Sequence, residues 1–120
     1  MRSTRSRVDE IPEVPESAYF EENELSCLLF QRSGDVGLGV PFNMASYGFL
    51  TCLLATHCGL NPGKLIHTIG DAHIYEEHIP MLKQQIERKP YPSPILTIDK
   101  KSYIDDYSLE DFQLNNYKAH

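Results

Sequence analysis

The residues whose types could support chemistry are concentrated in one run, QRSGDVGLGVPFNMASY, at positions 31–47. Arg32 offers a planar fork of N–H donors that suits phosphate oxygens, and Ser33 adds a hydroxyl group. The glycine-rich stretch that follows can present free backbone N–H groups to an anion, and it includes the carboxylate of Asp35. An Arg-Ser pair and a glycine-rich stretch also occur as a surface pair and a simple turn. On residue types alone, an anion site and a plain turn therefore both remain open.

An amide and a hydroxyl follow at the expected start of a helix. Asn43 and Ser46 are three positions apart, so they share one face of that helix. A side-chain amide can donate and accept hydrogen bonds at once, which suits the edge of a nucleic acid base. The run therefore combines a possible anion site, a carboxylate and an amide.

The elements that must position these groups follow from apolar patterning, which predicts an α/β chain with a mixed sheet and one buried central helix. The helix is expected from Pro41 to Cys58, because its residues are apolar on almost every side. The apolar run 25–32 is expected to be a strand that is buried on both faces, or on one face against a partner. A loop is expected over 33–41 and a strand over 64–70. A second helix is expected from Pro80 to Lys89, with Ile79, Leu82 and Ile86 facing inward. The last expected elements are a strand over 95–99 with Leu96 and Ile98 on one face, a turn or short helix over 104–107, and a strand over 111–116.

Composition narrows the possible function classes. The net charge of −6 provides no basic surface for DNA or an anionic membrane. Three cysteines without a framework spacing predict reduced thiols and a cytoplasmic protein. The basic opening MRSTRSR resembles a transit peptide, so a mitochondrial location stays open, and a nuclear location is a further alternative. Residues 1–20 are expected to form a flexible tail before a single domain at 21–120. No histidine or cysteine spacing indicates a metal site, and the central helix is short and polar for a membrane span.

The run at 31–47 strongly resembles the signature of thymidylate synthases. HTIGDAHIY, at 67–75, resembles a second block of the same family, and ELSC, KPYPSP and DFQLNNY also fit. Two long blocks in the family's order make the resemblance specific. It covers residues 24–117 and indicates the C-terminal portion of a thymidylate synthase fold.

The resemblance implies synthesis of dTMP from dUMP, with 5,10-methylenetetrahydrofolate as the donor of carbon and hydride. Arg32 and Ser33 would bind the phosphate of dUMP, and Asn43 would pair with the uracil edge. His73 and Tyr75 would hold the deoxyribose 3′-hydroxyl. Asp35 would contact both the folate and the base. Leu38, Gly39 and Phe42 would line the folate site, and Ser46 and Tyr47 would support the pocket from the helix.

The comparison with the family also shows a difference at the reactive group. In the family, a Pro-Pro-Cys-His loop with the nucleophilic cysteine precedes the strand that leads into ELSC, whereas this sequence reads PESAYFEEN there. Cys27, Cys52 and Cys58 lie in apolar runs and are expected to be buried and inert. The isolated chain is therefore expected to be inactive.

Two other interpretations remain open for such a chain. It could be a nucleotide-binding pseudoenzyme or a subunit that caps a full-length partner, or it could be a truncated product without independent function. Family members are homodimers joined through a sheet face, and residues 25–32 could present that face. A homodimer, or association with a full-length subunit, is accordingly expected.

Overall fold

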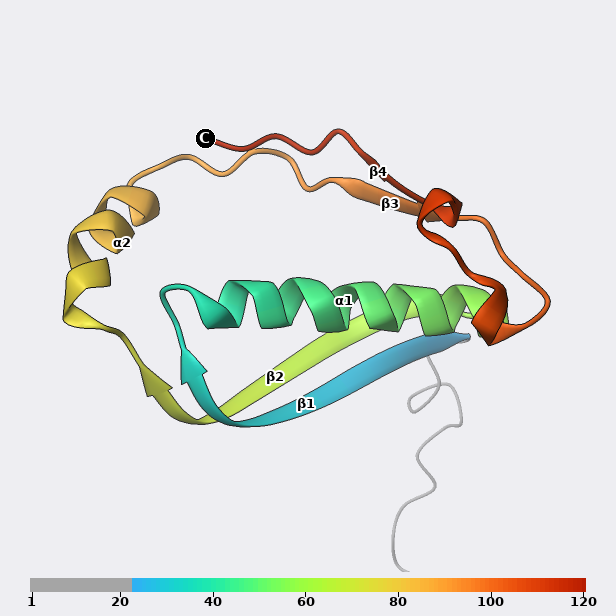
Figure 1. Ribbon diagram of the computed structural model, residues 1–120, viewed down its shortest axis with the longest axis horizontal. Coiled ribbons are helices and arrows are strands. Elements are labelled where there is room, and N and C mark those ends of the chain that lie inside the picture. Colours follow the sequence, from blue (N-terminus) through green and yellow to red (C-terminus); the bar gives the residue numbers. More distant parts are fainter. Residues whose placement is uncertain (1–22) are drawn as a thin grey trace, which may run out of the picture.

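The computed structural model describes residues 23–120 (Figure 1). The tail predicted over 1–20 lies outside the described residues. Strand β1 (Glu24–Asp35), helix α1 (Gly39–Cys58) and strand β2 (Asn61–His73) follow one another, and β1 and β2 pair in parallel. After helix α2 (Ile79–Ile86), strands β3 (Ile95–Ile98) and β4 (Phe112–Asn115) form a separate antiparallel pair. The predicted α/β class is confirmed, with its parallel and antiparallel strands in two small sheets.

Helix α1 is the central element of this arrangement. It crosses from the end of β1 back to the start of β2, as a parallel pair requires. Figure 1 shows α1 between the β1–β2 pair on one side and the β3–β4 pair on the other. The first turn of α1 packs closely on β1, because a Cβ atom at Gly34 would lie 2.9 Å from Cγ2 of Val40. This close approach holds the start of the helix beside the end of the strand.

The structure corrects the bounds of several predicted elements, including the helix expected from Pro41, which begins at Gly39. Strand β1 continues through Ser33, Gly34 and Asp35, which were expected to begin a loop, because they pair with 71–73 of β2. Strand β2 is correspondingly longer at both ends than the predicted 64–70. Helix α2 ends at Ile86 and not at Lys89.

The outer face of the β1–β2 sheet, which points away from α1, carries exposed apolar side chains. Leu28 is 71% exposed, Phe30 is 70% exposed and Ile66 is 52% exposed. Exposed and half-buried residues alternate along β1, as expected for a strand covered on one face only. Of the two interpretations of this strand, burial on both faces is wrong for the part of the chain that the structure describes.

The core of the described chain is very small. Val40 and Ala55 are its buried apolar residues, and no large side chain is fully buried there. Helix α1 lies at the centre, yet several of its apolar side chains are more than a third exposed: Phe42, Met44, Tyr47, Phe49, Leu50 and Leu54. The predicted buried helix is thus central but incompletely covered.

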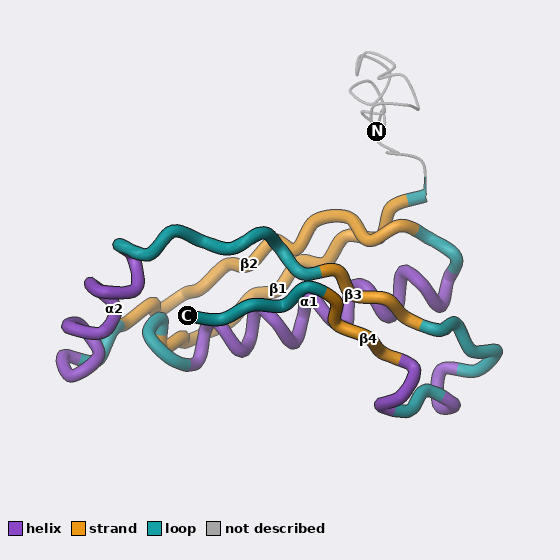
Figure 2. The backbone as a smooth tube through the Cα atoms, turned by 90° about the horizontal axis from the view of Figure 1, so that it is seen from above, coloured by secondary structure: helices purple, strands orange, loops and turns teal. Residues whose placement is uncertain are grey.

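The later elements agree with the sequence only in part. Leu96 and Ile98 share the half-buried face of β3, which confirms that prediction. The inward stripe predicted for the second helix is wrong for Ile79, which is 40% exposed, and for Ile86, which is 82% exposed, whereas Leu82 is half-buried. Helix α2 lies at one end of the described chain, beyond the end of the β1–β2 pair (Figure 2). Within the described residues, no helix has the length and apolar character needed to cross a bilayer.

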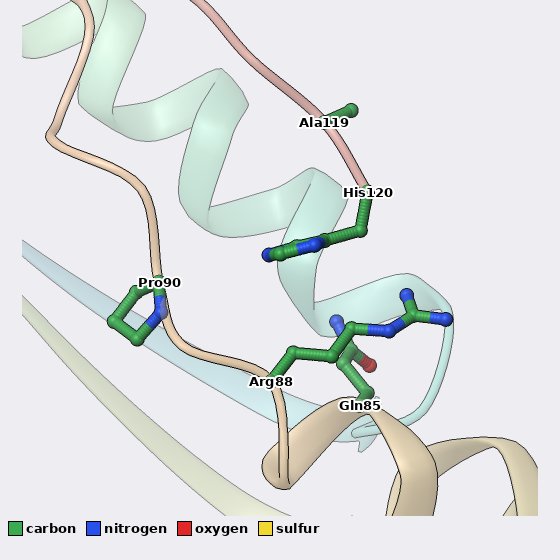
Figure 3. Close-up of a pocket in the computed structure, with 5 residues that line it drawn as sticks. All are labelled: Gln85, Arg88, Pro90, Ala119 and His120. Atoms are coloured by element: carbon green, nitrogen blue, oxygen red, sulfur yellow. The ribbon is translucent and has the colours of Figure 1, made fainter.

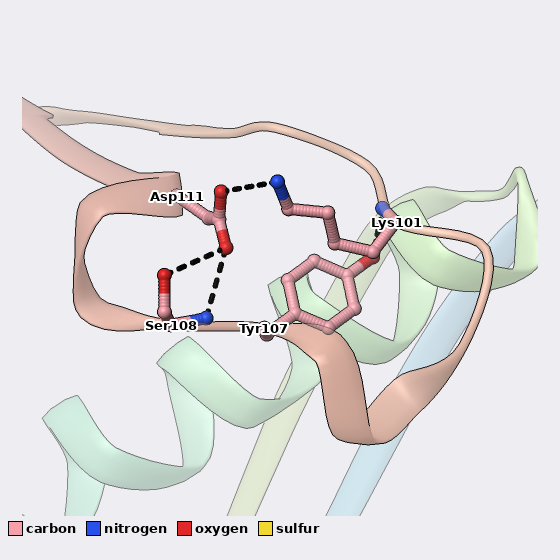
Figure 4. A network of polar contacts seen from close by, with 4 residues as sticks. All are labelled: Lys101, Tyr107, Ser108 and Asp111. Atoms are coloured by element: carbon pink, nitrogen blue, oxygen red, sulfur yellow. Dashed lines mark hydrogen bonds and ion pairs between the residues drawn. The ribbon is translucent and has the colours of Figure 1, made fainter.

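A polar network fastens the segment before β4 (Figure 4). Lys101 Nζ lies 2.7 Å from Oδ1 of the buried Asp111, and the backbone N–H of Ser108 donates to Asp111 Oδ2 at 2.8 Å. The hydrogen bond from Lys101 holds the pKa of Asp111 below its ordinary value, assisted by Ser108. The hydrogen bond to Asp111 in turn raises the pKa of Lys101.

These shifts predict how stability depends on pH. A carboxyl with a lowered pKa in the folded state contributes stability above its unfolded pKa, and that contribution is lost as the pH falls through the folded pKa. Asp111→Asn should therefore lower the midpoint temperature of unfolding at neutral pH. Below about pH 4, the midpoint temperature of this variant should fall less steeply with decreasing pH than that of the unsubstituted chain. Thermal unfolding at one protein concentration measures this, with the exposed Asp105→Asn as control. If the midpoint temperature fell equally steeply with acidification in Asp111→Asn and in the unsubstituted chain, the proposed contribution of the Asp111 carboxylate to stability would be contradicted.

Candidate functional site

The two sequence blocks meet at the carboxyl ends of β1 and β2. Asp35 pairs with His73 in the parallel ladder, and the backbone N–H of Val36 donates to the carbonyl of His73 at 2.9 Å. Helix α1 begins at Gly39, beside this end of the sheet. Ligands of parallel α/β units bind outside the carboxyl ends of the strands. The structure therefore brings the chemistry-bearing residues of both blocks to the place where a ligand is expected.

Asp35 organises the loop that leads into α1. Its Oδ1 accepts hydrogen bonds from the backbone N–H groups of Gly37 at 3.1 Å and Leu38 at 3.4 Å. The Nδ1 atom of His78 lies 3.8 Å from the same oxygen, and it is buried without a hydrogen-bond partner among the described residues. Gly37 permits this approach, because a Cβ there would lie 2.9 Å from His78 Nδ1. His78 was not among the predicted site residues, and no local pattern marks it.

His73 and Tyr75 lie together, as a shared contact to a sugar would require. Their rings meet edge to face with centroids 5.6 Å apart, and Tyr75 makes a similar contact with His78 at 5.7 Å. Tyr75 is 52% exposed, so the ring remains accessible to a ligand. Asp71 Oδ1 lies 3.9 Å from Nδ1 of His73, on the adjacent part of β2.

Asn43 projects toward the sheet and joins a network that the sequence did not reveal. Nε2 of Gln31 donates to Asn43 Oδ1 at 3.1 Å and to the carbonyl of Ser33 at 2.8 Å. Oε1 of the same Gln31 lies 2.9 Å from Nε2 of His67. Gln31 and His67 were not among the predicted site residues.

Arg32 and Ser33 are successive residues near the end of β1. The alternation of faces is not regular here, because Gly34, two positions after Arg32, is turned toward Val40 of α1. Ser33 is half-buried, whereas Arg32 is exposed. Among the described residues, Arg32 has no ion pair or side-chain hydrogen bond.

The residues expected to contact folate surround the start of α1. Leu38 and Gly37 line an open hollow of about 210 Å³ together with His78, Met81 and Leu82. Phe42 lies outside this hollow and is 69% exposed. Ser46 and Tyr47 are also exposed.

A second hollow lies where the C-terminal segment passes α2. It has a volume of about 420 Å³ and is lined by Gln85, Arg88, Pro90, Ala119 and His120. Figure 3 shows His120 and Arg88 on facing sides of it. His120 stacks on Tyr91 with ring centroids 4.3 Å apart, and its Nε2 lies 3.0 Å from the carbonyl oxygen of Lys89. These contacts attach the C-terminal segment to the connector after α2, and none of the predicted site residues lines this hollow.

The described residues hold no group of three His, Cys, Asp or Glu side chains that could bind a metal ion. The cysteines were expected to be buried, and this is wrong for Cys58, which is exposed at the end of α1. Cys27 and Cys52 are half-buried. Helix α1 is covered too incompletely to bury them.

Comparison with known proteins decides the family. The family model described as thymidylate synthase matches residues 13–120, nearly the whole chain. The chain belongs to the thymidylate synthase family. The match confirms the resemblance carried by the two sequence blocks, and it includes residues 13–20, which composition had assigned to a tail.

Individual members of the thymidylate synthase family are similar over most of this chain. The human thymidylate synthase is 56% identical over 103 residues, which are 85% of this chain and 33% of that protein. The thymidylate synthase of Saimiriine herpesvirus 2 is 53% identical over 103 residues, 85% of this chain and 35% of that protein. The bifunctional dihydrofolate reductase-thymidylate synthase of Paramecium tetraurelia is 52% identical over 105 residues, 87% of this chain and 23% of that protein. The chain thus spans about a third, or less, of the length of these relatives.

Proposed function

We propose that this chain forms the part of a thymidylate synthase that holds dUMP and folate for the synthesis of dTMP. The observation that carries the proposal is the meeting of the two family blocks at the carboxyl ends of β1 and β2, through the Asp35–His73 pairing. The donor of carbon and hydride would be 5,10-methylenetetrahydrofolate.

Each part of dUMP would meet a different group of this site. The Asn43 amide would pair with the uracil edge, and the exposed Tyr75 would reach the deoxyribose together with His73. Asp35 Oδ2 has no hydrogen bond to the described residues and faces the ligand in this proposal. The hollow at Leu38 would receive part of the folate ring system.

The phosphate would lie at the free edge of β1. In the two-stranded sheet β1 has β2 on one side only. The long stem of Arg32 can carry its guanidinium along that edge, toward Ser33. The phosphate is therefore the contact that needs the most direct test.

Arg32→Ala should weaken dUMP binding by about 1.5–3 kcal/mol, the range for hydrogen bonds to charged groups. Uridine, which lacks the phosphate, should lose little affinity. Folding should change little, because Arg32 is exposed and has no partner among the described residues. Calorimetric titration of both ligands measures the difference, with Arg88→Ala as the matched control. Equal losses for dUMP and uridine would show that Arg32 acts on the structure and not on the phosphate.

A second candidate function, that of an association module, is favoured by the outer face of the sheet. Leu28, Phe30 and Ile66 expose apolar surface there without cover from the described residues. In this role the chain would pair with a second copy, or with a longer subunit of the same family, through the β1–β2 sheet. Nucleotide binding and association are compatible, because the site lies at the carboxyl ends of the strands and the apolar surface lies along their outer face.

A further inference from the structure

We infer that Gln31, held by the Ser33 carbonyl and by His67, fixes the direction in which the Asn43 amide faces and thereby selects the pyrimidine. The inference rests on the proposed nucleotide site. An asparagine alone is a poor selector, because rotating its amide by half a turn exchanges the donor and the acceptor. Something else must therefore prevent Asn43 from turning to suit either base.

The direction of the network follows from its fixed end. The backbone carbonyl of Ser33 can only accept, so the atom of Gln31 that lies 2.8 Å from it is the nitrogen. Oε1 of Gln31 then faces His67 Nε2 at 2.9 Å, and that ring nitrogen must carry a proton to donate. The second proton on Gln31 Nε2 points to Asn43 at 3.1 Å, where only the oxygen can accept it. Asn43 is thus held with Oδ1 toward the sheet and Nδ2 turned away.

This orientation matches one pyrimidine edge and opposes the other. Asn43 Nδ2 can donate to a carbonyl such as uracil O4, and the second lone pair of Oδ1 can accept from uracil N3–H. Cytosine presents an amine and an unprotonated N3 at the same places, so donor would face donor and acceptor would face acceptor. Pairing with cytosine would require Asn43 to turn, which breaks its hydrogen bond from Gln31.

Gln31 is well placed for this role by the register of the sheet. Leu29 and Gln31 share the face of β1 that is turned to α1, and His67 lies opposite Leu29 on β2. All four members of the network are at least partly buried, which strengthens their hydrogen bonds and makes an unpaired group costly. Gln31 contacts the base only through Asn43, so it is a positioning residue.

Two substitutions separate this role from a structural one. Calorimetric titration of the full chain with dUMP and with dCMP should give at least about a tenfold preference for dUMP, the cost of one mismatched pair. Gln31→Met releases Asn43 and should bring the two affinities within about threefold of each other. Gln31→Glu can only accept, so Asn43 should turn Nδ2 toward it and the preference should reverse toward dCMP. Gln113→Met, on the exposed side of β4, is the matched control and should keep the preference.

Each outcome decides either the inference or the proposed function. An unchanged preference in both Gln31 variants, or equal binding of dUMP and dCMP by the unsubstituted chain, would overturn the inference and leave nucleotide binding intact. Binding of neither nucleotide would refute the proposed function. In that case the hydrogen-bond network can still be tested by solid-state ¹⁵N spectra of the chain with ring-labelled histidine, because these spectra require neither a small assembly nor a bound ligand. The His67 signals are assigned by their loss in His67→Phe. A hydrogen-bonded His67 Nε2–H signal that shifts in Gln31→Met supports it, and a signal that does not shift overturns it.

Discussion

The purified chain is expected to release no tritium above background from C5-tritiated dUMP in the presence of 5,10-methylenetetrahydrofolate. The covalent step needs a thiolate that can approach C6 of the pyrimidine to about 3–3.5 Å. Cys52 and Cys58 lie on α1, nine and fifteen residues beyond Asn43. At 1.5 Å per residue they are about 14 Å and 22 Å farther along the helix axis. Neither can reach a base held by Asn43.

Cys27 is excluded by the same kind of geometry. It precedes Gln31, the β1 residue that contacts Asn43, by four residues, a distance of about 13 Å along an extended strand. The binding groups that remain cannot replace the missing nucleophile, because they stabilise the bound nucleotide without forming the covalent adduct. Human thymidylate synthase in the same assay provides the positive control. Release above background that disappears in Cys27→Ser, Cys52→Ser or Cys58→Ser would show that one of these thiols acts as the nucleophile.

The sequence predicts β1, α1 and β2 because each is a long apolar run bounded by glycine, proline or polar residues. It also places Asn43 correctly near the start of the helix, since Pro41 and the apolar run after it mark that start. His73 and Tyr75 were grouped by their motif, and the structure confirms that they lie together. These features depend on residues that are near one another in the chain.

The features that were missed depend on residues far apart in the chain. The end of β1 at Asp35 is set by pairing with Asp71–His73, so the local glycines gave the wrong boundary. The contact between Gln31 and His67 joins residues 36 positions apart and requires the register of the parallel pair.

The chain is also expected to associate, or to aggregate, when it is purified alone. Leu28 and Phe30 are about 70% exposed on the outer face of the β1–β2 sheet. Phe42 on α1, which covers the opposite face of that sheet, is exposed to nearly the same extent. Burying one such side chain stabilises the folded state by about 1.5–3 kcal/mol. The stabilisation lost when several of them stay exposed is therefore comparable to the whole free energy of unfolding of a small domain, about 5–15 kcal/mol. Val40 and Ala55 form too small a core to offset this.

Light scattering coupled to gel filtration measures the assembly, and two sets of variants identify the surface responsible. The pair Leu28→Ser and Phe30→Ser removes apolar area from the outer sheet face and should weaken association at least about a hundredfold, from about 1.5 kcal/mol for each side chain. Ile86→Ser, on α2, replaces a side chain that is 82% exposed but lies away from that face, and should leave the assembly unchanged. An assembly that survives the paired substitution would instead be joined through α1. A monodisperse monomer with a sharp, cooperative unfolding transition would refute the prediction, because it would show that the small core suffices without a partner.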